Sequence, residues 1–331
     1  MAIDLLAIQP TTISRDLRGK YVLLYGKPKS GKTTAAVQFP RALLCAFEKG
    51  YNAIGGVKPV DVDKWSDFKQ VLRQLAKPEV KEIYETIVID TVSIAWDLCE
   101  QFVCAQNGVQ KIADIPWGGG YSAAKKEFES TLRKITQLGY GVVLIAHSAT
   151  RIEKGADGSD IEIISPELPK RAYEVCNGIV DIIGYIGNEW VNGEQHRWLY
   201  TRETPTLFAG SRFKHLAPKI PFSYQNLVNA IGEAIDKAEQ IDGAKVIEHA
   251  VAKEVEVLNF NEIRAEAESL WKQLLAKGQT DEEKQDIAKA ISKKIEMVFG
   301  RTMRLSEITE DQVDLFNLTV LDMRDMLESF K

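Results

Sequence analysis

The chain has 331 residues, of which 45% are hydrophobic and 27% charged, and its formal net charge is −5. This composition is typical of a globular protein that has room for a sizeable core and more than one domain. No run of about 18 apolar residues and no basic stretch leading into an apolar one occurs, which excludes the usual sequence signals of a membrane span and of secretion. We therefore expect a cytoplasmic protein with no membrane contact.

The cysteines and the charge distribution indicate which kinds of binding site are possible. None of the four cysteines has the C-x-x-C spacing, and all lie in apolar stretches, which favours buried reduced thiols over a disulfide or a zinc site: Cys45, Cys99, Cys104 and Cys176. The acidic excess lies beyond Ile241. The overall charge therefore does not exclude nucleic-acid binding by loops of the preceding part.

The first strong motif follows a short N-terminal arm, residues 1–19. An apolar, β-rich run at 21–25 leads into Gly26–Thr33, which fills every fixed position of the pattern G-x-x-x-x-G-K-[ST], and residues 33–39 predict a short helix. In such a loop, glycines let successive backbone N–H groups surround phosphates, the lysine reaches the β- and γ-phosphates, and the threonine hydroxyl binds Mg²⁺. We expect ATP and Mg²⁺ as cofactors, with contacts from Gly26, Lys29, Ser30, Gly31, Lys32, Thr33 and Thr34.

Further along, two buried strands end in acidic residues. Residues 42–48 predict a strand ending at Glu48, residues 65–76 a helix, and Thr86–Asp90 a buried parallel strand. Because α/β sheets place ligands at the carboxyl ends of their strands, Asp90 is expected to orient Mg²⁺ opposite Thr33. The alternative is that Asp90 caps the helix that follows.

A third strand ends in a polar residue as well. A helix at 92–106, a glycine-rich stretch at 107–121 and a second helix reaching about residue 138 lead to a strand at 141–147, which ends at His147. His147 could sense the γ-phosphate or position water, or it could be structural. Glu48 could activate the attacking water, or it could be a surface carboxylate paired with Lys49.

The remainder of this part predicts a loop, a helix and a hairpin. The composition of Ala149–Ser165 predicts a mobile loop, and a short helix carrying Lys170 and Arg171 follows. A strand at 179–186 and a second arm at 195–202 flank Asn192–Gly193, a strong signal for a tight hairpin turn. Residues 223–240 predict the closing helix of a domain that spans 20–240.

Residues 241–331 predict helices only. Two capping boxes, Thr280 with Glu283 and Thr309 with Gln312, precede segments with apolar stripes at helical spacing, as does Asn261. We expect a small, acidic, all-α C-terminal domain. No metal-ligand spacing and no dense basic face occurs in it.

The order of these elements resembles the RecA-like branch of P-loop ATPases over residues 21 to about 240. The resemblance implies an α/β fold with a mostly parallel central sheet, a catalytic role for Glu48, and a sensor role for His147. It also places Asn107–Tyr121 and Ala149–Ser165 where RecA relatives hold single-stranded DNA, although aromatic anchors and solvated charges are the alternative reading of those side chains. The implied DNA-binding residues are Lys111, Trp117, Tyr121, Arg151, Lys154, Lys170 and Arg171.

The sequence Phe47–Gly50 and the feature from Trp117 to Tyr121 are most similar to short RecA-like ATPases of phage recombination systems, the Sak-type single-strand annealing group. This resemblance implies a recombination ATPase that pairs or anneals DNA as a ring or filament in the bacterial host cytoplasm. It also implies a basic residue donated across the subunit interface to the catalytic site, Arg212 or its neighbours Arg202 and Lys214, whose alternative is a plain surface charge. The acidic helical part, which departs from the RecA pattern, could recruit a single-strand binding protein. A RecA-type helicase or its loader, and a non-hydrolysing nucleotide-gated adaptor, remain alternatives.

Overall fold

The computed structural model describes residues 6, 8–155, 157–249 and 259–330. Contacts divide the chain into two compact units, Pro10–Lys253 and a second unit that holds the helices after residue 258. The larger unit reaches past the expected boundary at residue 240, because strand β12 (Val246–Ile247) pairs in parallel with β1 (Ile13–Ser14). Part of the expected N-terminal arm is thus held in this unit by backbone hydrogen bonds.

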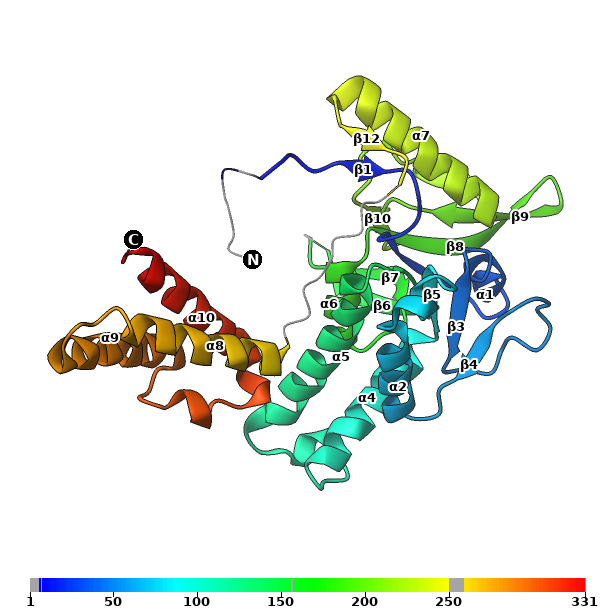
Figure 1. Cartoon of the computed structure of the whole chain (residues 1–331). Helices are drawn as coiled ribbons and strands as arrows, with labels where there is room; N and C mark the ends of the chain where they lie inside the picture. Colours follow the sequence, from blue (N-terminus) through cyan, green and yellow to red (C-terminus); the bar gives the residue numbers. More distant parts are fainter. Residues whose placement is uncertain (1–5, 7, 156, 250–258, 331) are drawn as a thin grey trace. The chain divides into compact units, whose positions relative to one another are not determined.

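The larger unit is built on a sheet of ten strands among the described residues (Figure 1). Its order is β11-β9-β8-β2-β6-β5-β3-β4, with β10 beside β8 and β7 beside β6, and the strands from β8 to β4 run parallel. The bounds are β2 Tyr21–Gly26, β3 Ala42–Ala46, β4 Pro59–Asp61, β5 Thr86–Asp90, β6 Gly141–Lys154, β7 Asp160–Pro166, β8 Ile182–Val191, β9 Glu194–Tyr200, β10 Gly210–Ser211 and β11 Lys219–Pro221.

Helices cover both faces of the parallel strands, so the strands are apolar on both sides. In β2, Leu23 and Tyr25 belong to the core on one face, and Val22 and Leu24 to the core on the other. The first face is covered by α2, α4, α5 and α6, and the second by α1 and α7 (Figure 1). The helices are α1 Lys32–Ala36, α2 Trp65–Leu75, α3 Pro78–Lys81, α4 Val92–Gln106, α5 Gly119–Gln137, α6 Lys170–Ile179 and α7 Tyr224–Asp242.

The strand order brings the predicted polar residues to one edge of the sheet. Strand β6 lies between β2 and β5, with Gly26 opposite His147 and Asp90 opposite Ile145. Strand β3 lies on the other side of β5, with Ala46 opposite Asp90. The phosphate loop, Asp90, His147 and the residues after Ala46 therefore meet at the carboxyl ends of neighbouring strands. This is the RecA-like arrangement that the element order predicts, and the fold class is confirmed.

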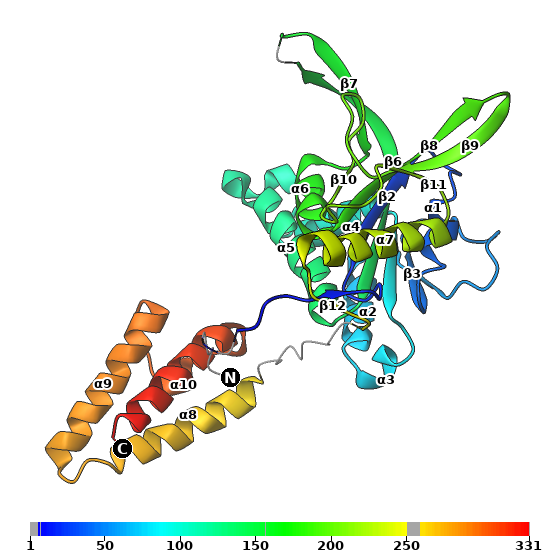
Figure 2. The same cartoon turned by 90° about the horizontal axis from the view of Figure 1, so that it is seen from above.

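The prediction of a mobile loop at Ala149–Ser165 is wrong. Strand β6 continues past His147 to Lys154 and pairs with β7 in an antiparallel hairpin, from Ser148 opposite Pro166 to Lys154 opposite Asp160. Isoleucines at 161 and 163 alternate with acidic residues in β7, which is the period of a strand, whereas the glycines of the turn and the charges along both strands gave the segment the composition of a loop. Figure 2 shows this hairpin projecting from the body of the unit.

The hairpin at Asn192–Gly193 is confirmed. Strands β8 and β9 pair from Val191 opposite Glu194 to Tyr185 opposite Tyr200, so the turn holds two residues. Both have positive φ, 52° for Asn192 and 85° for Gly193, as a two-residue turn between twisted strands requires. Figure 2 shows this hairpin projecting from the body of the unit as well.

The C-terminal unit is helical, as the sequence predicts. Helices α8 (Phe260–Leu275), α9 (Asp281–Phe299) and α10 (Val313–Glu328) enclose a core of their own that includes Leu274, Ile291 and Phe316. Helix α9 begins with the expected capping box, in which the Thr280 hydroxyl accepts from the N–H of Glu283. Among the described residues, no helix has the length and apolar character needed to cross a membrane.

Candidate nucleotide site

The phosphate loop, Gly26–Thr33, connects β2 to α1 and depends on two glycines. A Cβ on Gly26 would lie only 2.6 Å from the carbonyl oxygen of Ile186, so the neighbouring strand excludes any side chain there. Gly31 has a φ of 88°, in the left-handed region that favours glycine, and Lys29 has a φ of 63°. Thr34 is exposed in α1. The backbone thus curls as a phosphate cradle requires.

Two buried polar side chains of the loop fit an anionic ligand. Lys32 is 5% exposed, and its ammonium group donates to the carbonyl oxygens of Gly26 at 3.0 Å and Lys27 at 2.9 Å. Burial lowers the pKa of Lys32, and the carboxylates of Asp90 and Glu48 oppose that shift. The Ser30 hydroxyl is buried and has no hydrogen-bond partner among the described residues. A buried cation beside an unsatisfied hydroxyl is suited to a phosphate.

Thr33 and Asp90 are joined across the sheet edge. The Thr33 hydroxyl donates to Oδ2 of Asp90 at 2.5 Å, and Asp90 is 7% exposed. Burial raises the pKa of Asp90, partly offset by the bond from Thr33. No group of three or more His, Cys, Asp or Glu side chains forms an all-protein metal cage in the described part of the chain. One hydroxyl and one carboxylate suit Mg²⁺, which keeps several waters and binds through phosphates.

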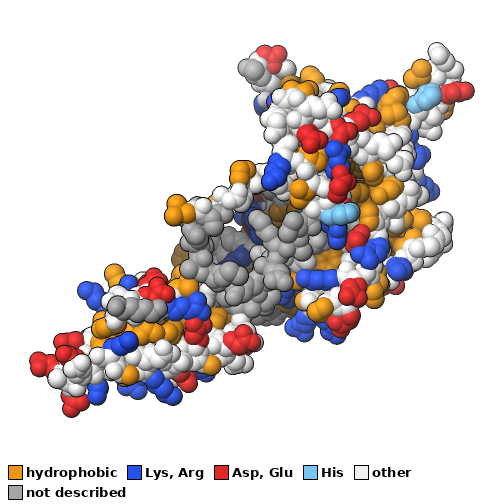
Figure 3. Space-filling view, turned by 45° about the horizontal axis from the view of Figure 1, so that its top comes forward, with side chains coloured by type: hydrophobic (Ala, Val, Ile, Leu, Met, Phe, Trp, Pro, Cys, Tyr) orange, Lys and Arg blue, Asp and Glu red, His pale blue; other side chains and the backbone are white. Residues whose placement is uncertain are grey.

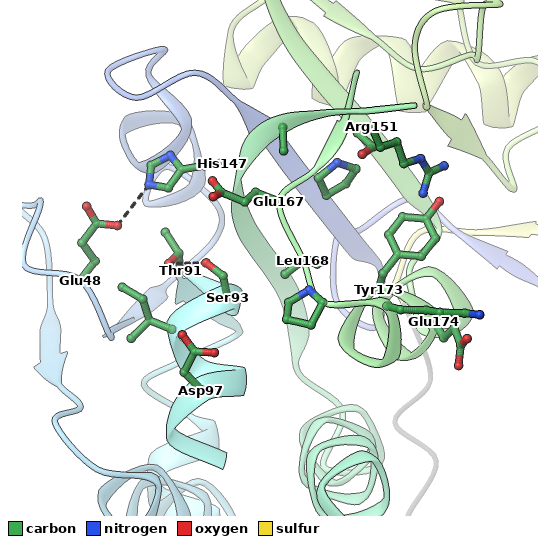
Figure 4. Close-up of a pocket in the computed structure, with 16 residues that line it drawn as sticks. Glu48, Thr91, Ser93, Asp97, His147, Arg151, Glu167, Leu168, Tyr173 and Glu174 are labelled. Atoms are coloured by element: carbon green, nitrogen blue, oxygen red, sulfur yellow. Dashed lines mark hydrogen bonds and ion pairs between the residues drawn. The ribbon is translucent and has the colours of Figure 1, made fainter. Parts of the chain in front are cut away.

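Glu48 and His147 face each other beside this pair. The backbone N–H groups of Phe47 and Glu48 both donate to the carbonyl oxygen of Asp90, at 2.8 and 2.9 Å, which fixes the backbone at Glu48. The Glu48 carboxylate lies 3.3 Å from Nε2 of His147 (Figure 4). Lys49, the expected alternative partner, instead lies 3.5 Å from Asp63. Glu48 is thus directed at the site by its neighbours.

A cavity of about 1160 Å³ opens next to these two side chains. It extends from Glu48 and His147, past the first turn of α4, to the base of the β6–β7 hairpin (Figure 4). Its wall is rich in acidic groups, and the acidic and basic residues along it are Glu48, Asp97, His147, Arg151, Glu167, Lys170 and Glu174. The cavity could admit water to Glu48 and His147.

The predicted DNA-binding residues divide into two groups. Trp117 is fully exposed and has a φ of 60°, Lys111 and Lys170 are exposed, and the Arg171 guanidinium lies 4.6 Å from the ring centre of Tyr121. Two others are engaged within the β6–β7 hairpin. Their contacts are an ion pair of Lys154 with Asp160 at 2.5 Å, and an ion pair of Arg151 with Glu153 beside the rings of Tyr173 and Phe208.

The basic residues predicted to act across an interface lie at the opposite, amino edge of the parallel strands. Arg212 donates to a carboxylate oxygen of Asp181 at 3.2 Å and to the carbonyl of Gly178 at 2.7 Å. Arg202 donates to three backbone carbonyls, and Lys214 pairs with Asp242 at 2.7 Å. None of them belongs to the nucleotide site of its own chain.

The structure places one further cation, Arg197, at the phosphate loop, where the sequence did not predict it. Arg197 lies on β9, opposite Asn188, and a Cβ placed on Gly31 would come within 2.9 Å of its Nη1. The hairpin turn at Asn192–Gly193 predicts that Arg197 pairs with Asn188, but the register of β8 against β2, which places that pair beyond Gly26, gives no local signal in the sequence.

Comparisons with known proteins identify the family to which the chain belongs. A family model described as an AAA domain, AAA_24, matches residues 18–213. The chain is 29% identical over 339 residues to the SPbeta prophage-derived uncharacterized protein YorG of Bacillus subtilis (strain 168), covering 99% of both chains. Among solved structures, it is similar to the KaiC-like protein PH0186 from Pyrococcus horikoshii OT3, with 17% identity, a TM-score of 0.35, and coverage of 62% of this chain and 86% of the other. The flagellar accessory protein FlaH from Methanocaldococcus jannaschii matches at 10% identity and a TM-score of 0.36, over 62% and 85%.

The family match spans more than half of the chain and includes the phosphate loop, Glu48, Asp90 and His147. These are the residues that the sheet brings together at one edge. The chain belongs to the AAA_24 family of P-loop AAA domains.

Proposed function

We propose that the chain is an ATP- and Mg²⁺-dependent ATPase of phage DNA recombination, which binds single-stranded DNA and promotes annealing or strand pairing. The observation that carries the hydrolytic part is the convergence of five side chains. The Thr33–Asp90 pair suits a metal ion, Lys32 is buried in the loop, and Glu48 faces His147 at 3.3 Å. Charge neutralisation around a transferred phosphoryl group is what lowers its barrier.

Each of these residues then has a distinct task. Lys32 compensates charge on the β- and γ-phosphates, and Thr33 with Asp90 would hold Mg²⁺, which would neutralise charge on phosphate oxygens. Glu48 accepts a proton from the attacking water, and His147 orients the Glu48 carboxylate through their shared hydrogen bond. The cavity beside them supplies the path for that water.

One exposed aromatic side chain favours single-stranded DNA as the partner. Trp117 is fully exposed, whereas one face of the Tyr121 ring is covered by Arg171, which leaves Tyr121 a weaker candidate. Stacking on exposed aromatic rings is the sequence-tolerant way in which proteins hold single strands, with nearby cations such as Lys111 and Lys170 contacting phosphates. Figure 3 shows basic and acidic side chains interspersed over the visible face of the molecule.

The setting of this activity is also a proposal. The likeness to a prophage-derived protein supports a phage role, in the cytoplasm of a bacterial host. Assembly into a ring or filament would let a neighbouring subunit donate Arg212, Arg202 or Lys214, which its own site does not use. The acidic helices α8–α10 would recruit a single-strand binding protein.

The deciding experiment measures ATP turnover with and without single-stranded DNA. Wild type should hydrolyse ATP only with Mg²⁺ and faster with DNA, and Lys32→Ala should lose hydrolysis while keeping its fold. Lys27→Ala, which removes an exposed lysine from the same loop, is the matched control. Turnover of Lys32→Ala at the wild-type rate would overturn the site, and salt-independent DNA binding would overturn the DNA part.

The same assay separates the alternatives. Duplex unwinding by the wild type would point to a helicase. ATP binding without turnover, even on single-stranded DNA, would point to an adaptor that uses the nucleotide as a switch.

A further inference from the structure

Strand β9 carries a cation past the end of the phosphate-loop strand. In the sheet, Ile186 of β8 is level with Gly26, the last residue of β2. Asn188 lies two residues further on and pairs with Arg197. Arg197 therefore stands beyond the edge of the sheet, on the side where the phosphate loop curls.

Its guanidinium closes on the loop itself. The position of a Cβ on Gly31 lies 2.9 Å from Nη1 of Arg197 and 3.5 Å from Cε1 of Phe222. The two residues are tied together, because the N–H of Phe222 donates to the carbonyl oxygen of Arg197 at 2.9 Å. Because Gly31 has no side chain, the space beside it stays open. The guanidinium of Arg197 and the ring of Phe222 border that space.

Arg197 also differs from the basic residues that closely follow it in the chain in the partners of its side chain. It is exposed, and no acidic partner is found for it in the ranges that the structure describes. Arg202, Arg212 and Lys214 all have carbonyl or carboxylate partners within the fold. A guanidinium without a carboxylate, held beside a loop that binds anions, has donors free for a phosphate, which it can contact through two parallel hydrogen bonds.

We propose that Arg197 binds a phosphate group of the nucleotide held in the phosphate loop of its own chain, as a second cation beside Lys32. The inference rests on the proposed nucleotide binding and adds a contact made within the chain, distinct from any residue donated by a neighbour. It makes the β8–β9 hairpin one wall of the nucleotide site.

The test is equilibrium binding of ADP and of a non-hydrolysable ATP analogue, measured by calorimetry on the full chain. Arg197→Ala should weaken both by about tenfold to a hundredfold, the range of a charge-assisted hydrogen bond. Arg197→Lys should lose less, because it keeps the charge and gives up only the forked geometry. Arg73→Ala, which removes an exposed arginine near the end of α2, is the matched control and should bind like wild type.

A second measurement separates ligand contact from a structural role. Without nucleotide, the melting temperature of Arg197→Ala should equal that of wild type, and the stabilisation by ADP should be smaller. Unchanged affinity in Arg197→Ala, while wild type and Arg73→Ala bind and hydrolyse ATP, overturns this inference alone. Failure of the wild type to bind any nucleotide overturns the proposed function together with it.

Discussion

Exchange of Glu48 for glutamine isolates the proton-accepting step. Glutamine has nearly the same shape, and the backbone at this position is fixed by the carbonyl of Asp90, so the side chain stays beside His147. The Glu48 side chain is 46% exposed, and the substitution should therefore change the free energy of unfolding by no more than about 0.5 kcal/mol. What is lost is the negative charge that accepts the proton.

A positioned general base contributes about 10²- to 10⁴-fold to a rate, which corresponds to roughly 3–5 kcal/mol of the barrier. We expect Glu48→Gln to lose this much in kcat, measured as phosphate release, and to bind ATP as tightly as wild type. Glu167, which lines the same cavity and whose N–H donates to the carbonyl of His147, supplies the matched variant Glu167→Gln. A fall in kcat of less than tenfold in Glu48→Gln would refute the assignment. A larger fall in Glu167→Gln than in Glu48→Gln would also refute it, and would move the base to Glu167.

Three further results are expected. Because burial raises the pKa of Asp90 above its ordinary 3.8, the folded chain retains a proton there that the unfolded chain has lost, and the free energy of unfolding falls as pH rises through that window. In EDTA, Asp90→Asn should therefore gain stability relative to wild type from acid to neutral pH, and a trend in the opposite direction in thermal melts would contradict this. Trp65→Ala should destabilise the larger unit by about 3–5 kcal/mol in denaturant titrations, because its ring is 1% exposed and stacks on Phe128; a loss below about 1 kcal/mol would mean that the core is not packed as described. Mixed assemblies of Lys32→Ala and Arg212→Ala subunits should regain turnover, and equal inactivity of verified mixtures would remove Arg212 as a donated residue.

The sequence predicts the central site because each part of it depends on local chemistry. The phosphate loop needs glycines and a lysine at fixed spacing, and an unbroken apolar run predicts the strand that ends at Asp90. These two signals predict the parallel strands β2 and β5 and the polar residues at their ends. Once the order of strands resembles a known core, Glu48 and His147 are placed as well.

The sequence fails where pairing between distant segments decides the outcome. The β6–β7 hairpin was hidden because its turn dominates the composition, whereas its stability comes from seven pairs between two strands. Arg197 was missed because its position depends on how far β8 and β9 extend beyond β2, which a local pattern does not show. In both cases, the register between paired strands, and not the type of residue, determines where the side chains lie.

Strand β6 carries His147 at the sheet edge and then runs without interruption to Lys154. At about 3.3 Å per residue, the hairpin tip stands about 23 Å from the histidine along the strand. On an arm of this length, a tilt of about 10° at the pivot moves the tip by about 4 Å. If β6 moves as a rigid rod, a small rotation beside the phosphate loop would therefore displace the hairpin tip by nearly the roughly 4.8 Å that separates neighbouring strands.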